Sequence, residues 1–563
     1  MDLFDVSLDT LPSPFKLHQM KQSLKSKKVL IVEDQATMRK AIREMIYGFD
    51  MKLITEAANG SSAIAAMRKE SFDIVLCDYN LGSGKNGQQV LEEARFRKLL
   101  PFYAVFIMVT AEQTQSMVLG AMDNKPDEYM TKPFNAEQLL NRIKRNISRK
   151  EYLGDIEKAI DSGNISLAIA QCDKKLLENN RLMHTHLLKL RAQLAIKIGD
   201  LKKATAIYQA VLEQSELNWA TLGLGIIAYL QDDFSEAEAI FRKLIDDYPM
   251  MLEAFDWLAK THEAQGDFAG AQNTLNEATA LSPQAILRQQ KLATMANMNG
   301  ELTIAEKAYK TAIDLGKNSV HHSSGDFAGL AKIYSKTDAK SALKTLKDMR
   351  SLYFGNPEAE LRAALLETEV FHQLADEESS VQAYQTAQKL SLELGNKAPT
   401  DLRLEMIKTS YLKGDDKAAN KELEQLIKNH ADDDHFMGDV RKVLNETGNA
   451  QQGEKLIARI KKELVEINNK GVDLFRQGNI TEATQVFQKA ATTMPENKTI
   501  MINMVKILLH DLKTNEVNKE KIQRIQTFIN KASQFGVKKE KIEHLQAQLN
   551  NLSHKINSTA SQE

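Results

Sequence analysis

Several side chains in the first quarter of the chain could together bind a divalent cation and a phosphoryl group. Glu33 and Asp34 follow the apolar run 29–32, and Asp78 ends the apolar run 74–77. Three carboxylates at one place repel one another and favour a hard cation such as Mg²⁺, which prefers carboxylate oxygens and water. A carboxylate kept ionised in this way can attack phosphorus as a nucleophile. We therefore predict that Asp78 is a phosphoacceptor and that all three carboxylates bind Mg²⁺.

A hydroxyl group and an ammonium group complete this set. Thr110 follows an apolar run at 103–109, and Lys132 precedes Pro133 just after another short run. Lys132 offers a compact positive charge that suits a phosphoryl oxygen. Thr110 could donate its hydroxyl to that oxygen only if its loop moved inward, which would couple phosphorylation to a change of shape. Each side chain taken alone could instead be a helix cap or a surface charge, so the hypothesis depends on all five together.

These five positions meet only if strands and helices alternate along the chain. From Lys27, short continuous apolar runs, typical of buried parallel strands, alternate with amphipathic stretches. This pattern predicts an α/β domain with a doubly wound, five-stranded parallel sheet. The carboxyl ends of such strands meet at one edge, where ligands bind. The predicted strands are 29–32, 52–57, 73–78, 103–109 and 128–130, and the predicted helices are 35–47, 59–69, 86–98, 112–122 and 135–148.

The order of an acidic pair, a lone Asp, a Thr and a Lys-Pro closely resembles the receiver domain of two-component response regulators. The resemblance implies that the backbone carbonyl of Asn80 is a further metal ligand. It also implies that Tyr129 is a switch aromatic, which turns inward when the Thr110 loop closes. Asn80 and Glu112 occupy the positions at which the family tunes the lifetime of the phosphoryl group. The acidic pair is Glu-Asp rather than Asp-Asp, a substitution that the family tolerates.

After Arg149 the predicted strands end, and a helical pattern continues to about residue 550. Small, aromatic and proline positions recur there every 34 residues, which resembles the tetratricopeptide repeat (TPR), a helix-turn-helix unit. Two helices cross closely only where Gly or Ala removes bulk and a large side chain fills the space beside it. Since one unit cannot bury its own face, the units must stack into an all-α solenoid. The recurring sets are Gly225/Ala237/Phe241/Pro249, Ala259/Ala271/Leu275/Pro283 and Ala293/Ala305/Tyr309, with further copies at Gly163/Ala168/Cys172, Gly199/Ala204/Tyr208, Gly414/Ala419/Leu423 and Gly471/Ala483/Phe487.

Parts of the helical region fit the repeat less well. The stretch from about 320 to 400 has only Ala342 and Ala387 as anchors, so we expect the array to be bent, interrupted or irregular there. The segment 321–325 is a turn-rich insertion, and its two histidines are expected in a solvated loop rather than at a metal. An amphipathic helix from Lys538, with Leu545 and Leu549 on one face, could cap the array.

Composition excludes several other classes of protein. The formal net charge of -1 gives no sign of a nucleic-acid partner. The basic cluster 142–150 lacks interleaved aromatic residues and is interpreted as a solvated helix face. No apolar run is long enough to span a membrane. Two cysteines, Cys77 and Cys172, do not support a disulfide framework and indicate a reducing cytoplasm. No P-loop, HExxH or helix-turn-helix motif of an enzyme or transcription factor is present.

The sequence thus predicts an N-terminal arm (1–26), a receiver (27–148), a TPR-like solenoid (149–550) and a polar tail (551–563). We expect a bacterial response regulator, not an enzyme, that accepts a phosphoryl group from a sensor histidine kinase or a phosphotransfer protein. The fourth helix, fifth strand and fifth helix of the receiver would change shape and act on the solenoid.

The solenoid would bind a protein or peptide in its groove, and a sensor kinase is one candidate partner. The alternative is a constitutive scaffold in which the receiver serves mainly for docking. Dimerisation through the receiver stays open, as does the choice between a mobile tail and a docking arm for the N-terminal segment.

Overall fold

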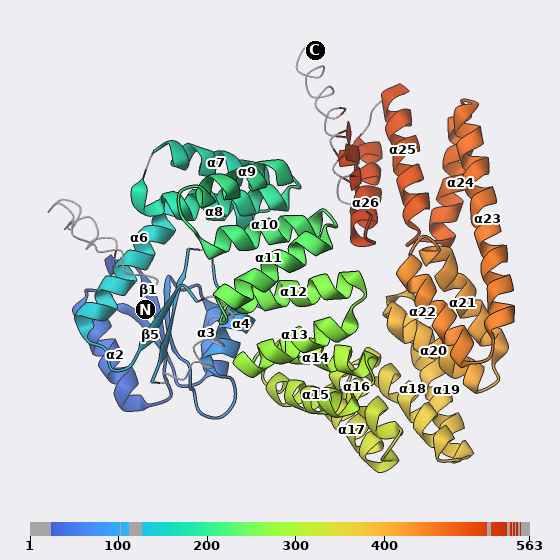
Figure 1. Ribbon diagram of the computed structural model, residues 1–563, viewed down its shortest axis with the longest axis horizontal. Helices are drawn as coiled ribbons and strands as arrows, with labels where there is room; N and C mark the ends of the chain where they lie inside the picture. Colours follow the sequence, from blue (N-terminus) through green and yellow to red (C-terminus); the bar gives the residue numbers. More distant parts are fainter. Residues whose placement is uncertain are drawn as a thin grey trace. The chain divides into compact units, whose positions relative to one another are not determined.

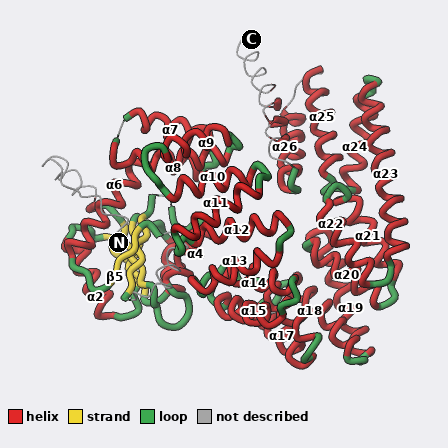
Figure 2. Tube along the Cα trace, viewed as in Figure 1, coloured by secondary structure: helices red, strands yellow, loops and turns green. Residues whose placement is uncertain are grey.

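The computed structural model describes residues 24–101, 103–111, 126–178, 180–514, 519–537, 541–542, 544–546, 548–549 and 552. In this part of the chain the strands gather in one sheet near the N-terminal end, and the other regular elements are helices joined by turns and loops (Figure 2). The chain divides into two compact units, residues 1–333 and 334–563. The predicted combination of an α/β domain with a long all-α region is confirmed.

The sheet has the strand order β2-β1-β3-β4-β5, and every neighbouring pair is parallel. Its inner strands are β1 (Lys28–Val32), β3 (Ile74–Asp78) and β4 (Val105–Thr110), and its edge strands are β2 (Leu53–Ala57) and β5 (Glu128–Thr131). The inner strands are buried almost throughout because both faces of the sheet are covered. The predicted doubly wound sheet is therefore confirmed.

Two layers of helices cover the sheet (Figure 1). Helices α2 (Ala36–Gly48) and α6 (Ala136–Asp161) share a buried apolar cluster with one face. Helices α3 (Gly60–Lys69) and α4 (Gly87–Phe96) share a cluster with the other. Reciprocal side-chain caps define where α3, α4 and α6 begin, because an Asn at each N-cap accepts the third amide of its helix. The predicted helix at 112–122 lies outside the described residues.

Helix α6 does not end near Ser148, so that prediction was wrong. It continues to Asp161 without a break, because its apolar periodicity continues beyond the receiver. Leu153 and Ile156 are buried in a cluster with the two helices that follow, whereas Ile147 is buried against the sheet. The last helix of the receiver is therefore also the first helix of the solenoid.

The basic cluster on α6 is paired with acids rather than simply solvated. Arg142 and Arg145 both form ion pairs with Glu128. Arg149 and Lys150 pair with the Asp127 carboxylate at 3.1 and 3.0 Å. Because Asp127 and Glu128 lie at the start of β5, these pairs fasten the connecting helix to the edge of the sheet.

The helices after α6 follow one another as hairpins (Figure 1). The predicted small-large pairs hold them together: a Cβ atom on Gly225 would lie 2.6 Å from Cε1 of Phe241, which is fully buried. The first unit contains α7 (Ile165–Leu177), α8 (Arg181–Lys197), α9 (Leu201–Leu212), α10 (Asn218–Leu230), α11 (Phe234–Asp247), α12 (Leu252–Gln265), α13 (Phe268–Leu281), α14 (Ile286–Met298), α15 (Leu302–Gly316) and nearly all of α16 (Ser324–Ser335).

The second unit has the same construction. A Cβ atom on Gly471 would lie 2.3 Å from Cε2 of Phe487. Its elements are α17 (Ala339–Leu352), α18 (Pro357–Gln373), α19 (Glu377–Leu394), the short 3₁₀ helix η1 (Gly395–Lys397), α20 (Thr400–Leu412), α21 (Asp416–His430), α22 (Asp434–Glu446), α23 (Ala450–Arg476), α24 (Ile480–Thr493), α25 (Lys498–Thr514) and α26 (Lys519–Gln534).

The stretch from 320 to 400 forms well-defined helices, and its anchors Ala342 and Ala387 are fully buried. The division between the two units falls inside this stretch, in agreement with the expected interruption. Near the C-terminal end, Leu545 and Leu549 are buried in a cluster with residues of α24, α25 and α26. Among the described helices, none combines the length and the apolar character needed to cross a lipid bilayer.

Candidate functional site

Three carboxylates meet at the carboxyl edge of the sheet. Glu33 and Asp34 follow β1, and Asp78 ends the neighbouring strand β3. One oxygen from each lies within 4.8 Å of an oxygen of the other two. Glu33 is 1% exposed and Asp78 is 7% exposed, whereas Asp34 faces solvent. The structure therefore brings together the three acidic residues predicted to share a site.

Lys132 places its ammonium group between two of these acids. Its Nζ donates a hydrogen bond of 2.8 Å to Oε2 of Glu33 and forms an ion pair of 3.0 Å with Oδ2 of Asp78. The backbone amide of Lys132 donates to the carbonyl of Thr110 at 2.7 Å, which fixes where its side chain starts. The peptide bond from Lys132 to Pro133 is cis.

Burial dominates the electrostatics of the site. It raises the pKa of the Asp78 carboxyl although Lys132 acts in the opposite direction, and the charge of Asp34 raises it further. Burial likewise raises the pKa of Glu33 against the effect of Lys132. Burial would lower the pKa of Lys132, but its contacts with Glu33 and Asp78 outweigh burial and raise it. A second cation would therefore help these acids to remain ionised together.

The donor set fits a hard divalent cation. All three candidate ligands are carboxylates, the oxygens that Mg²⁺ prefers. Oε1 of Glu33 is buried, and within the described part of the chain it accepts no hydrogen bond. A buried carboxylate oxygen without a donor is costly unless a cation supplies the missing interaction.

The other predicted residues are distributed around this centre. Thr110 is 1% exposed and ends β4, where the preceding Val109 pairs with Asp78. Tyr129 lies on β5 opposite Met108, partly buried against the cluster beneath α3 and α4. Asn80 is exposed, and its Oδ1 accepts the amide of Gly82 at 3.3 Å. Glu112 lies outside the described residues.

A group of charged residues around α4 was not predicted from the sequence. Glu93 is only 4% exposed although it is charged, and its carboxylate pairs with Lys85, Arg97 and Arg68. Burial would raise the pKa of Glu93, but Lys85 and Arg97 together hold it below its usual value. Lys85 and α4 also contact the solenoid, and no spacing or motif in the sequence indicates this.

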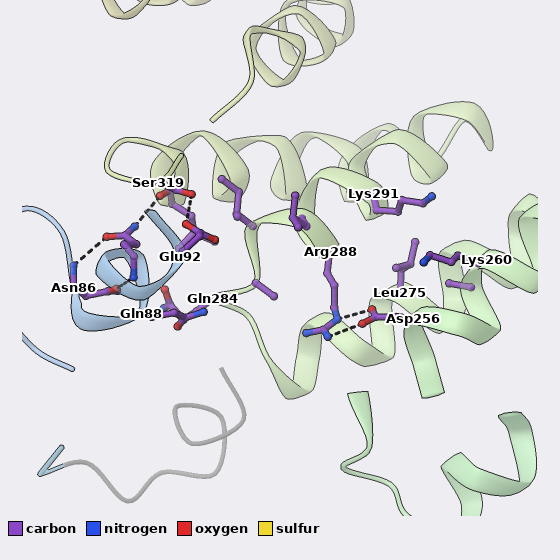
Figure 3. Close-up of a pocket in the computed structure, with 16 residues that line it drawn as sticks. Asn86, Gln88, Glu92, Asp256, Lys260, Leu275, Gln284, Arg288, Lys291 and Ser319 are labelled. Atoms are coloured by element: carbon purple, nitrogen blue, oxygen red, sulfur yellow. Dashed lines mark hydrogen bonds and ion pairs between the residues drawn. The ribbon is translucent and has the colours of Figure 1, made fainter. Parts of the chain in front are cut away.

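A cavity of about 350 Å³ lies between α4 and the solenoid, and its lining residues do not include the three acids (Figure 3). Arg288 and Asp256 form a two-pronged ion pair on its solenoid wall, with distances of 2.7 and 2.8 Å. The residues of α4 on the opposite wall include Gln88, Gln89 and Glu92.

Comparison with known proteins agrees with this geometry. The family model "Response regulator receiver domain" matches residues 29–144. The chemotaxis protein CheY-3 of Vibrio cholerae serotype O1 is 30% identical over 125 residues, which are 22% of this chain and 95% of that protein. This chain belongs to the response regulator receiver family. Its receiver is also 30% identical over 122 residues to the chemotaxis protein CheY of Pseudomonas aeruginosa, covering 22% of this chain and 97% of that protein.

Two further similarities concern the receiver and the solenoid. A solved CheY-like receiver domain protein from Methanospirillum hungatei JF-1 is 25% identical, covers 22% of this chain and 96% of its own, and has a TM-score of 0.21. The family model "Tetratricopeptide repeat" matches residues 189–251, which run from the middle of α8 to just past the end of α11. The chain is thus a CheY-like receiver followed by TPR-type helical repeats.

Proposed function

We propose that this chain is a response regulator of a bacterial two-component phosphorelay, phosphorylated on Asp78, whose output is protein binding by the solenoid. The observation that carries the proposal is the position of Asp78, in contact with Lys132 and within 4.8 Å of Glu33 and Asp34. A lone buried carboxylate at a strand end could simply cap the helix that follows. A carboxylate that shares its site with two acids and one ammonium is suited to nucleophilic attack on phosphorus.

Four groups of the chain would hold Mg²⁺: the side chains of Glu33, Asp34 and Asp78, and the backbone carbonyl of Asn80. When bound, Mg²⁺ would neutralise charge on the transferred phosphoryl group. The Glu-Asp pair supplies two of the three carboxylates, and the unshared Oε1 of Glu33 supports this assignment.

The reaction is a transfer of the phosphoryl group from a phosphohistidine to Asp78. A bond forms between an oxygen of Asp78 and phosphorus while the histidine nitrogen–phosphorus bond breaks, and the imidazole leaves. The Lys132 ammonium and the Thr110 hydroxyl then contact phosphoryl oxygens, and Tyr129 turns inward. Asn80 and Glu112 set the rate at which water later removes the group. The chain is not an enzyme in this scheme, because the product is its own signalling state.

The partners follow from the two parts of the chain. A sensor histidine kinase or a phosphotransfer protein supplies the phosphoryl group, and a protein or peptide occupies the TPR groove, with no nucleic acid or membrane involved. In this proposal the signalling takes place in the cytoplasm. This compartment is reducing, which suits two cysteines, Cys77 and Cys172, whose thiols are free and buried. In this proposal residues 27–148 act as the receiver and residues 149–550 act as the solenoid.

Beryllofluoride, which mimics a phosphoryl group on Asp78, can be used to test whether phosphorylation changes what the solenoid binds. Proteins of the host extract that bind the immobilised full chain are compared with and without beryllofluoride and Mg²⁺, with Asp78→Asn as the chain that cannot respond. The proposal expects at least one partner whose recovery changes with beryllofluoride on the wild type and does not change on the variant. Equal recovery under all conditions would favour the alternative, a constitutive scaffold.

A further inference from the structure

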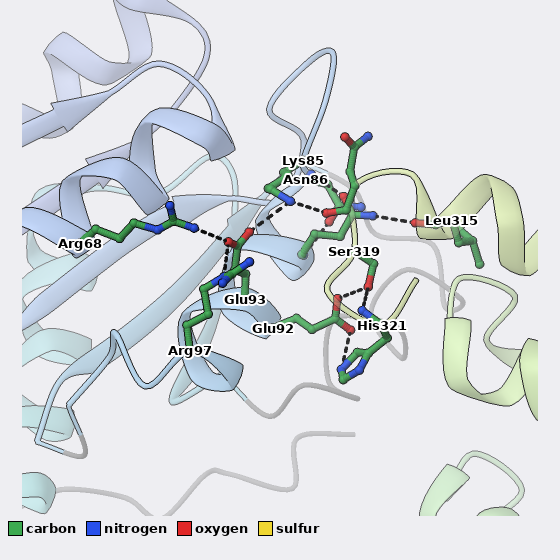
Figure 4. A network of polar contacts seen from close by, with 11 residues as sticks. Arg68, Lys85, Asn86, Glu92, Glu93, Arg97, Leu315, Ser319 and His321 are labelled. Atoms are coloured by element: carbon green, nitrogen blue, oxygen red, sulfur yellow. Dashed lines mark hydrogen bonds and ion pairs between the residues drawn. The ribbon is translucent and has the colours of Figure 1, made fainter. Parts of the chain in front are cut away.

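The receiver and the solenoid meet at a second place besides the shared helix α6, and both sides belong to the same compact unit. The segment 315–321, at the end of α15 and after it, lies against α4 and the loop before it (Figure 4). We call this region the α4 contact. Hydrogen bonds across it run from Lys85 Nζ to the carbonyl of Asn318 (2.6 Å), from Gln89 Nε2 to the carbonyl of Leu315 (3.2 Å) and from Ser319 Oγ to Oε2 of Glu92 (2.6 Å).

The α4 contact is a specific arrangement rather than a loose touch between surfaces. Ser319 is 5% exposed, and its hydroxyl also accepts the amide of His321 at 3.0 Å. Nε2 of His321 lies 3.5 Å from Oε1 of Glu92. The ring of His321 meets Phe96 edge to face, with the ring centroids 5.8 Å apart. The histidine predicted to lie in a solvated loop is therefore part of this contact.

The receiver side of the contact is tied mechanically to the phosphoacceptor. The amide of Gly87, the first residue of α4, donates to the carbonyl of Tyr79 at 2.8 Å. Gly87 lies so close to the end of β3 that a Cβ atom there would be 2.2 Å from the carbonyl oxygen of Asp78. A Cβ atom on Gly60 of α3 would lie 2.6 Å from Cβ of Lys85. The loop from Asp78 to Gly87 is therefore packed at both places with no spare room.

The same residues that organise the start of α4 also contact the solenoid. Oε1 of Gln89 accepts the amide of Asn86 and completes the cap of α4, while its Nε2 reaches the solenoid. Nζ of Lys85 forms an ion pair of 3.1 Å with Glu93 and also donates to the carbonyl of Asn318 in the solenoid. A shift of the helix start would consequently disturb several of these hydrogen bonds at once.

We propose that the α4 contact is an intramolecular latch that phosphorylation of Asp78 loosens. This inference rests on the proposed phosphorylation of Asp78. A phosphoryl group adds one phosphorus and three oxygen atoms to a carboxylate that is 7% exposed, with Gly87 pressed against its backbone. Any rearrangement of this loop around the added group would carry Lys85 and the start of α4 with it, because Gly87 is packed against the backbone carbonyl of Asp78.

Loosening the latch changes what the solenoid offers to a partner. The cavity beside the contact is bounded on one side by Gln89 and Glu92 of α4 and on the other by Asp256, Arg288 and Lys291 of the solenoid (Figure 3). Movement of α4 opens this cavity and uncovers its solenoid wall. The receiver thus controls a surface of the solenoid directly, in addition to any change transmitted along α6.

Hydrogen–deuterium exchange on the full chain tests the latch. Beryllofluoride and Mg²⁺ are added to the wild type and to Asp78→Asn, and exchange is followed at 78–82 and at 315–322. If the latch loosens, beryllofluoride should slow exchange near Asp78 and speed exchange at 315–322 by about fivefold or more. Neither change should occur in Asp78→Asn. Slower exchange near Asp78 with unchanged or slower exchange at 315–322 would overturn the latch alone. No change near Asp78 would instead count against the proposed function.

Linkage supplies a second and reciprocal test. If binding at Asp78 loosens the latch, breaking the latch must tighten binding at Asp78 by the same factor. We expect Glu92→Ala and Ser319→Ala each to bind beryllofluoride about fivefold more tightly, and the double variant to gain little beyond either, because both remove the same hydrogen bond. Glu44→Ala, an exposed change on α2, serves as the matched control and should match the wild type. Unchanged affinity in both latch variants would contradict the proposal.

Discussion

Lys132 and Asp78 form an ion pair of 3.0 Å although their strands are not neighbours in the sheet. Strand β4 separates them, so the side chain of Lys132 reaches past the end of β4 to the acidic edge. The pair is largely buried, with side-chain exposures of 11% and 8%. Removing the cation would leave Asp78 and Glu33 as uncompensated buried acids, which is far more costly than losing a surface pair.

Lys132→Ala should therefore destabilise the receiver by about 3–5 kcal/mol near neutral pH. The loss should shrink as the pH falls, because without Lys132 both carboxyl pKa values rise further and the acids become protonated and neutral. Thermal unfolding midpoints at pH 5 and pH 7.5 would check this. Lys40→Ala, at a 78% exposed position, is the control and should change little. A loss that is equal at both pH values would contradict the role given to Lys132 in the site.

Mg²⁺ binding should depend on the exposed acid of the site. Asp34→Asn removes one charged ligand without opening a buried gap, so we expect Mg²⁺ to bind roughly tenfold more weakly, with little change in stability. Isothermal titration of the purified chain with Mg²⁺ measures this directly. Asp50→Asn, a similar change on the surface away from the acidic edge, should bind Mg²⁺ like the wild type. Equal Mg²⁺ affinity in Asp34→Asn would remove Asp34 from the metal site.

Some of the site could be predicted from the sequence because its residues are fixed by strand ends. A continuous apolar run predicts a buried parallel strand, and parallel strands present their carboxyl ends at one edge. Asp78, Thr110 and Lys132 could therefore be placed together before any geometry was known. The hydrogen bond between Ser319 and Glu92 could not, because it joins residues 227 positions apart whose types are common on any surface.

The packing of the repeats gives a prediction for the solenoid. Gly225→Ala would place a Cβ atom 2.6 Å from the ring of Phe241, so we expect a loss of about 1–3 kcal/mol in the first unit. Gly154→Ala in α6 meets open space and should stabilise by about 0.5–1 kcal/mol, since Ala favours helix over Gly. Unfolding midpoints of the two variants measure the difference. If the Gly225→Ala variant were as stable as the Gly154→Ala variant, the close crossing of α10 and α11 would not be required for the stability of the first unit.

In the helical region, the sequence pattern predicted a close helix crossing correctly but placed a helix end wrongly. Gly225 and Phe241 could be paired from their spacing, because a close helix crossing needs one small and one large residue. The end of α6 was misplaced, because nothing in the residues around Ser148 stops a helix. The apolar positions Ile147, Leu153 and Ile156 belong to two different cores but share one periodicity.

A buried acid on α6 predicts a pH dependence of stability. Burial raises the pKa of Glu157 from 4.5 to about 7, against the opposing charge of Lys150 at 3.9 Å. Because the folded pKa is the higher one, stability is fullest below pH 4.5 and is lost as the pH rises through about 7. Glu157→Gln should therefore be more stable than the wild type by about 1–3 kcal/mol at pH 8, and by much less at pH 5. Chemical denaturation at both pH values checks this. A variant that is less stable than the wild type at pH 8 would show that the ionised acid is stabilising.

The most direct test is phosphoryl uptake by the full chain. The wild type, Asp78→Asn and the surface control Asp50→Asn are incubated with radiolabelled acetyl phosphate and Mg²⁺, and the label on each chain is counted. If Asp78 is the phosphoacceptor, the wild type and Asp50→Asn should be labelled equally, and both should lose that label in the presence of a chelator. Asp78→Asn should carry no label above background. Labelling of Asp78→Asn at the rate of the wild type would contradict the assignment of Asp78 as the phosphoacceptor.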